Sequence, residues 1–153
     1  MDIVDRATRS RMMASIKGRD TKPETILRKA LHRRGLRYRL HASELPGRPD
    51  IVLPRHRAAV LVHGCFWHRH GCRLTSTPAS NSDFWQAKFA STVERDARQM
   101  RQLVELGWRV ATVWECALRH DGPDVVANAV AEWLASTATS IDIPNTPELQ
   151  QRP

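Results

Sequence analysis

Three histidines, two cysteines and two adjacent aromatic residues crowd into the short segment 61–72. Thiolate and imidazole are ligands that zinc prefers, and a closed structural zinc site holds four of them in a tetrahedron. Cys65, His70 and Cys72 would supply three ligands, and Cys116 is the one cysteine left in the sequence to supply the fourth. These residue types predict a structural zinc site. The alternative is a buried pair of cysteines beside solvated histidines.

A second group, Asp50 with His63 and His68, could hold a divalent cation and move a proton. Asp50 opens an apolar run after Pro49, and His63 closes the next apolar run. An aspartate that opens a strand beside the end of a neighbouring strand is a usual metal ligand in nucleases. Nucleases with a Pro-Asp…(Asp/Glu)-x-Lys motif end that neighbour in acid-x-Lys, whereas this chain has Leu-Val-His there. An ordinary turn is the alternative, and the flanking histidines favour the metal site.

Three residues could assist proton transfer at such a site. His68 lies outside the zinc pattern and can accept a proton from water near neutral pH, which suits phosphodiester hydrolysis. Asp96 lies near the apolar face of a predicted helix, where an unpaired carboxylate is costly, so it either pairs with an arginine or orients a histidine. Glu24 could contribute a further carboxylate, with helix capping as its alternative role.

Large aromatic residues lie among these polar groups. Phe66 and Trp67 are flanked by the predicted zinc ligands, which leave the loop little freedom to bury both side chains, and Trp85 follows a loop rich in Ser, Thr and Pro. Exposed aromatic side chains beside basic residues can wedge between base steps of DNA and unstack them. Core packing is the alternative, above all for Trp85.

The charge is strongly positive and unevenly distributed. The net charge is +8, and twelve of the 24 Lys and Arg residues lie between Arg6 and Arg39 against two acids, whereas from Glu115 onward two arginines face six acids. A basic front half predicts a polyanionic partner, for which nucleic acid is the usual candidate. Three cysteines cannot all pair, and no segment resembles a signal peptide or a membrane span, so we expect reduced thiols in the cytosol.

Apolar periodicity predicts the elements that position these side chains. A helix begins with Thr21 as N-cap and Pro23 in its first turn, and Gly35 ends it. The remaining elements are strands at 36–40, 50–53 and 58–63, with a hairpin turn at 54–57, then a helix at about 83–106, a strand at 108–114 and a helix at 125–134. If the third and fourth strands are parallel neighbours joined by the long helix, Cys65 and Cys116 lie at the same edge of the sheet.

This order of elements predicts an α/β fold with helices flanking a central sheet. We expect an N-terminal arm at 1–20, a globular domain at 21–135 and a tail at 136–153. The arm is basic, and Met12, Met13 and Ile16 allow one short amphipathic helix in it. The tail is rich in Ser, Thr, Pro and Gln without periodicity, so we expect it to be disordered.

Over about residues 5–135 the sequence resembles the very short patch repair (Vsr-type) endonucleases. The most specific matching blocks are His-Gly-Cys-Phe-Trp-His at 63–68 and Trp-Glu-Cys-Ala-Leu at 114–118, supported by Leu-Pro-Gly-Arg-Pro-Asp at 45–50. The resemblance implies a restriction-endonuclease-like fold, a variant of the PD-(D/E)xK superfamily with a mixed central sheet and a structural zinc site. It also implies a Mg²⁺-dependent enzyme that nicks DNA 5′ to the thymine of a T·G mismatch, the product of 5-methylcytosine deamination.

The resemblance further implies a role for each site residue. Asp50 and the backbone carbonyl of Val62 would bind Mg²⁺, His68 would be the general base, and His63 would lie beside the scissile phosphate. Glu24 and Asp96 would be supporting carboxylates, with Asp96 partnering a histidine. The zinc ligands would be Cys65, His70, Cys72 and Cys116. The contacts with DNA would come from Phe66, Trp67, Trp85, Met13, Ile16, Arg19, Arg48 and Arg69.

Two positions depart from the family pattern. Val62 replaces a residue that is often threonine, and Arg69 stands in a run that is often all histidine, where it would add a phosphate contact. The expected partner is double-stranded DNA with a T·G mismatch, and mismatch-repair proteins are further candidates. We expect a monomer that acts at the nucleoid in the bacterial cytoplasm, without membrane contact. The alternatives are another DNA nuclease of the same superfamily and a zinc-stabilised DNA-binding module without catalysis.

Overall fold

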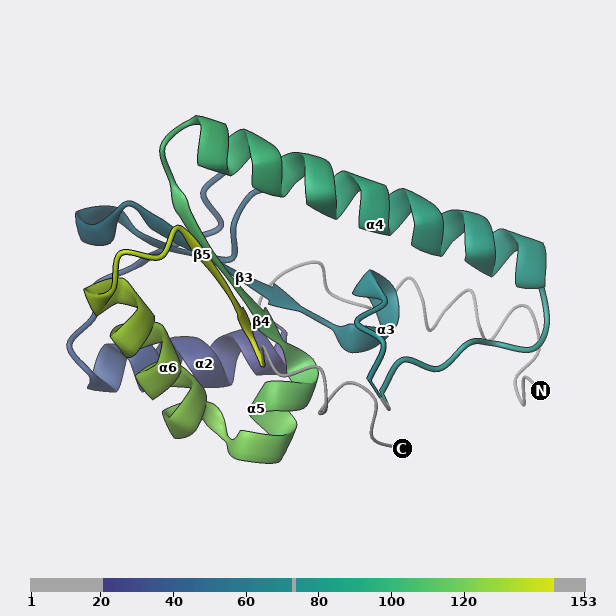
Figure 1. Cartoon of the computed structure of the whole chain (residues 1–153). Coiled ribbons are helices and arrows are strands. Elements are labelled where there is room, and N and C mark those ends of the chain that lie inside the picture. The colour runs from purple at the N-terminus through teal and green to yellow at the C-terminus, as the bar shows by residue number, and fades with distance from the viewer. Residues whose placement is uncertain (1–20, 73, 145–153) are drawn as a thin grey trace.

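The computed structural model describes residues 21–72 and 74–144, which form a five-stranded mixed sheet with helices on both faces (Figure 1). In chain order the elements are α2 (Lys22–Arg33), β1 (Arg39–Leu40), β2 (Ile51–Leu53), η1 (Pro54–His56), β3 (Ala58–His63), α3 (Cys65–His68), α4 (Ser82–Glu105), β4 (Arg109–Trp114), α5 (Glu115–Asp121), α6 (Pro123–Ala135) and β5 (Ser140–Ile143). The mixed α/β architecture that the sequence predicts is confirmed. Among these described residues, none of the helices has the length and apolar character needed to cross a membrane.

The pairing direction changes within the sheet, whose order is β1-β2-β3-β4-β5. β1, β2 and β3 are antiparallel neighbours, whereas β4 runs parallel to β3 and β5 runs parallel to β4. A parallel connection needs a long crossover, and α4 supplies it between β3 and β4. The register sets His63 opposite Trp114, so β3 and β4 end at the same edge of the sheet, where α3 and α5 begin.

Helices cover the two faces of the sheet unequally. α2, α5 and α6 lie on one face, where the larger core joins Leu31 of α2 to Val60 and Val113 of the central strands (Figure 1). α4 crosses the other face, and near its C-terminus Leu103 packs with Val110 in a smaller core. The N-terminal half of α4 lies over α3 instead of the sheet (Figure 1). α4 thus packs on the sheet at one end and on α3 at the other.

The start of α2 follows the signals in its sequence. The Thr21 hydroxyl accepts a hydrogen bond from the Glu24 N–H at 3.5 Å, and Pro23 lies in the first turn, where an N–H has no intrahelical partner to lose. The Glu24 side chain points inward and is only 4% exposed. The capping turn thus brings a carboxylate into the protein interior.

The two short helices and the length of the first strand differ from expectation. α3 and α5, with 4 and 7 residues, were not predicted, because helices this short leave little periodic signal in a sequence. The strand expected at 36–40 is reduced to Arg39–Leu40, which pair with Val52 and Ile51, because the partner strand β2 has only three residues. The predicted turn at 54–57 is η1 followed by Arg57 in a left-handed conformation.

The expectation of a disordered tail from residue 136 is wrong for residues 136–144. Ser140–Ile143 pair with β4 as β5, and Ile143 is buried against the larger core. Arg109 orders the preceding turn, because its guanidinium donates to the carbonyls of Leu134, Ser136 and Ala138. The polar composition of the segment gave no strand signal in the sequence. Its backbone N–H and C=O groups pair with the edge of β4. Residues 145–153 and the arm at 1–20 lie outside the described residues.

Candidate active site

A cleft of about 940 Å³ opens between α4, along residues 88–103, and the edge where β3 ends. Segments far apart in the sequence line it: the start of α2, the turn at 46–50, the end of β3, α3 and α4. All five residues predicted for catalysis line this one cleft, namely Glu24, Asp50, His63, His68 and Asp96. The fold therefore brings together side chains that the sequence places in four separate segments.

Asp50 lies directly before β2, and a backbone group of β3 holds its carboxylate. Asp50 Oδ2 accepts a hydrogen bond from the Val62 N–H at 2.7 Å. Burial raises the pKa of Asp50 to about 7; the Val62 N–H opposes the rise, and the nearby charge of Glu24 adds to it. Oxygens of Asp50 and Glu24 lie within 4.8 Å of each other, and two carboxylates this close are a favourable place for a cation, so the acidic pair fits a metal site.

His63 and His68 form a stacked pair inside the cleft. Their ring centroids lie 3.8 Å apart with an interplanar angle of 6°, and Trp114 packs edge-on against His63. The Nδ1 atom of His63 is buried and has no hydrogen-bond partner among the described residues. Burial lowers the pKa of His63 to about 3, and the neighbouring His68 lowers it further. His63 is therefore neutral throughout the physiological pH range.

A carboxylate on α4 orients His68. The Nδ1 atom of His68 lies 2.5 Å from Asp96 Oδ2, and both side chains are largely buried, at 19% and 18% exposure. Arg95 approaches the other oxygen of Asp96 at 4.0 Å. Asp96 thus contacts both of the partners weighed for it, an arginine and a histidine, and the histidine is the closer of the two. Because the carboxylate engages Nδ1, the Nε2 atom of His68 is the ring nitrogen left for proton transfer.

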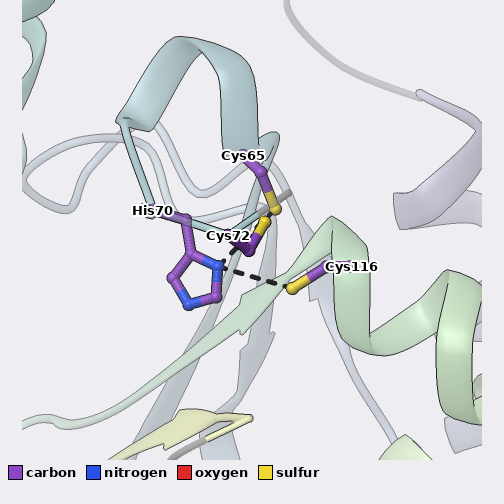
Figure 2. Close-up of side chains that lie close together, drawn as sticks. All are labelled: Cys65, His70, Cys72 and Cys116. Carbon is purple, nitrogen blue, oxygen red and sulfur yellow. Dashed lines mark hydrogen bonds between the residues drawn. The ribbon is translucent and has the colours of Figure 1, made fainter. Parts of the chain in front are cut away.

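The predicted zinc ligands converge at the ends of β3 and β4, as Figure 2 shows. His70 Nδ1 lies 3.8 Å from Cys65 Sγ and 3.4 Å from Cys116 Sγ. One ligand atom from each of these residues and Cys72 falls within 4.8 Å of the others. A tetrahedral zinc with ligands at roughly 2.0–2.3 Å would separate S and N atoms by about 3.5 Å. The four side chains are thus arranged closely enough to hold one metal ion.

The chemistry of the cluster also fits a metal. Burial raises the pKa of the Cys65 thiol above its usual range and that of Cys116 to about 11, so the deprotonated, metal-ligating forms of these two thiols would need a compensating cation. His70 stacks on Trp114, with ring centroids 4.3 Å apart, and this contact helps hold the imidazole toward the sulfurs. The cluster joins α3 to α5 and can fix the loop that carries the cleft residues.

The aromatic residues divide into a pair that lines the cleft and a buried group that packs behind this pair. Phe66 and Trp67 are half-buried on α3 and line the cleft. Trp85 and Phe89 of α4 lie against Phe66, and Trp85 is only 5% exposed. The structure buries Trp85 in this cluster, so it cannot insert into DNA from this position. The core-packing alternative describes Trp85 better than a surface wedge does.

Arg69 differs from expectation, because its guanidinium binds its own chain. It donates to the Ser76 carbonyl and the Thr77 hydroxyl, both at 2.7 Å, and lies over the Phe89 ring at 4.0 Å. These contacts tie down the loop after α3 and occupy the side chain that was expected to bind a phosphate. Arg48, by contrast, is exposed and lines the cleft. Met13, Ile16 and Arg19 lie outside the described residues.

Two basic residues of the cleft were missed. Lys88 and Arg95 line it from α4 together with Thr92 and Asp96. Residues four and seven apart share one face of a helix, so this spacing was a usable signal. The two cations could face the phosphates of a nucleic acid that enters the cleft.

Comparison with known proteins defines the class to which this fold and cleft belong. The family model described as DNA mismatch endonuclease Vsr matches residues 1–74. The chain is 43% identical to the DNA mismatch endonuclease Vsr of Escherichia coli K12, over 93% of both chains. It is 46% identical to the type II nicking enzyme V.XorIIP of Xanthomonas oryzae, over 72% of this chain and 82% of that one. It is 41% identical to the type II nicking enzyme V.NmeAIP of Neisseria meningitidis, over 78% and 85%.

These relatives bear the names of endonucleases and nicking enzymes, so the protein is an endonuclease by descent. More narrowly, the chain belongs to the Vsr family of DNA mismatch endonucleases. The resemblance carried by the sequence blocks is confirmed.

The raised pKa of Asp50 predicts a pH-dependent stability. The ordinary value is 3.8 and the folded value is about 7, so without a bound cation stability falls as pH rises between these values. Asp50→Asn removes this cost and keeps an oxygen for the Val62 N–H. We expect the variant's advantage in unfolding free energy to grow by about 2 kcal/mol between about pH 5.5 and pH 8, at ~1.4 kcal/mol per pKa unit.

Urea unfolding without added divalent cation measures this advantage. Asp124 is exposed and pairs with Arg33 at the surface, so Asp124→Asn is the matched control and should show no comparable growth with pH. An Asp50→Asn advantage of the same size at both pH values would contradict the raised pKa.

Proposed function

We propose that this protein nicks one strand of duplex DNA on the 5′ side of the thymine in a T·G mismatch. The observation that carries the proposal is the meeting of Asp50, His68 and Asp96 in one cleft of a chain that belongs to the Vsr family. T·G mismatches arise by deamination of 5-methylcytosine. The mismatched duplex would reach the protein in the bacterial cytoplasm, with mismatch-repair proteins as further partners and the protein acting as a monomer.

The acidic pair would hold the catalytic cation. Asp50 and the backbone carbonyl of Val62 would bind Mg²⁺, and Glu24 would add charge beside them. When bound there, Mg²⁺ supplies positive charge against the scissile phosphate. The hydrogen bond from the Val62 N–H to Oδ2 fixes the orientation of the Asp50 carboxylate.

His68 would accept the proton of the attacking water, and His63 would support it. Asp96 holds Nδ1 of His68, so Nε2 can take a proton from the attacking water, and the imidazolium that forms lies beside the Asp96 carboxylate. His63 stacks on His68 and stays neutral, so it fixes the plane of the base without adding repulsion. From this position it would lie beside the scissile phosphate, and Arg48, Lys88 and Arg95 would face the backbone of the duplex.

The remaining residues would hold the DNA-facing surface in place. Cys65, His70, Cys72 and Cys116 would bind one structural Zn²⁺, which would anchor α3 between its ligands. Phe66 and Trp67 would then contact unstacked bases at the mismatch. Trp85 would support both side chains from α4, because its ring packs against theirs. The arm at 1–20, with Met13, Ile16 and Arg19, would reach the minor groove. The endonuclease domain would run from residue 21 through β5.

Catalysis separates this proposal from a DNA-binding module without activity. Asp50→Ala should abolish nicking of a T·G duplex with Mg²⁺, because placement of the cation is lost. His68→Ala should slow nicking by about 10²–10⁴-fold, the usual worth of a positioned general base. Binding to the same duplex should persist in both variants. Single-turnover nicking and binding assays measure the two properties, and unchanged nicking in either variant would show that the active site lies elsewhere.

The Cys-His cluster predicts one tightly bound zinc per chain. Cys116→Ser should lose zinc and lower the unfolding free energy, because closure of a structural metal site contributes to folding. His120→Gln is the control, since His120 also lies on α5 but pairs with Asp121 at the surface. Elemental analysis and urea unfolding check both effects. Freshly purified, folded protein without zinc would count against the assignment.

The aromatic pair predicts a selective loss of mismatch binding. Trp67→Ala should weaken binding to T·G duplex by about 1–3 kcal/mol, the range measured for stacking of a base on an aromatic side chain. Phe84→Ala is the control, because Phe84 is 53% exposed and does not line the cleft. Fluorescence anisotropy with T·G and matched duplexes measures the difference. If Trp67→Ala unfolds the protein, its role is core packing.

A further inference from the structure

One histidine beside the acidic pair has no part in the mechanism above. His41 follows β1, and one of its ring nitrogens lies within 4.8 Å of a carboxylate oxygen of Glu24 and of Asp50. The three side chains come from three separate segments: the first turn of α2, the end of β1 and the residue before β2. Such a meeting of one imidazole and two carboxylates has the composition of a divalent-cation site.

The backbone accounts for the position of His41. β1 and β2 are antiparallel, with Leu40 opposite Ile51, and the His41 N–H donates to the Asp50 carbonyl at 3.2 Å. His41 is therefore the cross-strand neighbour of Asp50 just past the end of β1, and its ring lies close to the Asp50 carboxylate. Its φ of 50° is left-handed, a conformation uncommon outside glycine and enriched at Asn, Asp and His. Strained residues of this kind cluster at ligand sites.

Two carboxylates and one imidazole meet closely at this position. Glu24 is 4% exposed, and one carboxylate oxygen of Asp50 accepts a hydrogen bond from the Val62 N–H of β3. A carboxylate oxygen of Glu24 lies within 4.8 Å of one of Asp50, so the two acids are close enough to share one cation. A divalent cation in contact with both carboxylates would reduce the repulsion between them, and a nitrogen of the His41 ring could complete the ligand set.

We propose that His41 is a third protein ligand of the cation held by Asp50 and Glu24, and that its ring nitrogen makes the site prefer Mn²⁺ to Mg²⁺. The inference rests on the proposed cation site at Asp50 and deepens it. Mg²⁺ favours oxygen ligands and retains its waters, whereas Mn²⁺ accepts carboxylate and imidazole together. A nitrogen ligand would therefore make the site discriminate between Mn²⁺ and Mg²⁺ more strongly than the carboxylates of Asp50 and Glu24 alone would.

The experiment measures metal binding by the zinc-loaded, full-length protein. His41→Asn removes the ring nitrogen and keeps a residue that tolerates the left-handed backbone, and His41→Gln is a second variant with longer reach. Mn²⁺ binding, followed by electron paramagnetic resonance, should weaken by about tenfold or more, since even a hydrogen-bonding partner of a metal ligand is worth roughly 10–100-fold. Mg²⁺ affinity, measured by competition, should change by less than about threefold. Pulsed resonance on bound Mn²⁺ should lose its imidazole nitrogen modulation.

Two controls separate the possible failures. His56→Gln, in the turn between β2 and β3, should leave the Mn²⁺ affinity and the nitrogen modulation unchanged. An unchanged ratio of Mn²⁺ to Mg²⁺ affinity in both His41 variants, or nitrogen modulation that persists in them, overturns the role of His41 alone. Mn²⁺ binding that survives Asp50→Ala places the cation elsewhere and overturns the proposed cation site as well. Nicking with Mg²⁺ by the wild-type protein tests the endonuclease activity independently of either result.

Discussion

The parallel pairing of β3 with β4 is the constraint on which the rest of the site depends. Because the register sets His63 against Trp114, the chain leaves both strands at one edge of the sheet. Cys65 and Cys116 therefore approach the same histidine although a long helix separates them in the sequence. The crossover that parallel pairing requires is α4, and this helix also carries Asp96 and walls the cleft. A single connection thus serves both the metal-ligating cluster and the catalytic cleft.

The short helix α3 transmits this constraint to the reactive side chains. A helix of four residues has almost no stability of its own, so its geometry must come from its neighbours. On one side Cys65 belongs to the Cys-His cluster, and on the other Phe66 packs against Phe89 of α4. His68 is held at its Nδ1 atom by Asp96. Each of these contacts restrains a different residue of α3, which explains how a loop-like segment can present an aromatic pair and a base in fixed positions.

The cleft contains one acidic group that resists ionisation and one basic group that resists protonation. On the side of α2 and β2, burial and the charge of Glu24 oppose the ionisation of Asp50. On the side of β3 and α3, burial and His68 oppose the protonation of His63. Strongly perturbed ionisable groups in a cleft are typical of functional sites, because the ligand or transition state supplies the missing charge. A cation against the carboxylates and a phosphate near the histidines would satisfy both sides.

The sequence by itself determined the α/β class, the long helix, the helix start at Thr21 and the ligand types of the cluster, because these depend on local periodicity, capping and residue chemistry. Only the tertiary structure decided the rest. Ser140–Ile143 became a strand because the edge of β4 and Arg109 satisfy its backbone and the preceding turn. Trp85 became buried because α3 packs on α4, and Arg69 is occupied by nearby carbonyls. His41 meets Asp50 through sheet register. Such outcomes depend on which residues, distant in the sequence, become neighbours in the folded chain, and no local sequence pattern encodes these contacts.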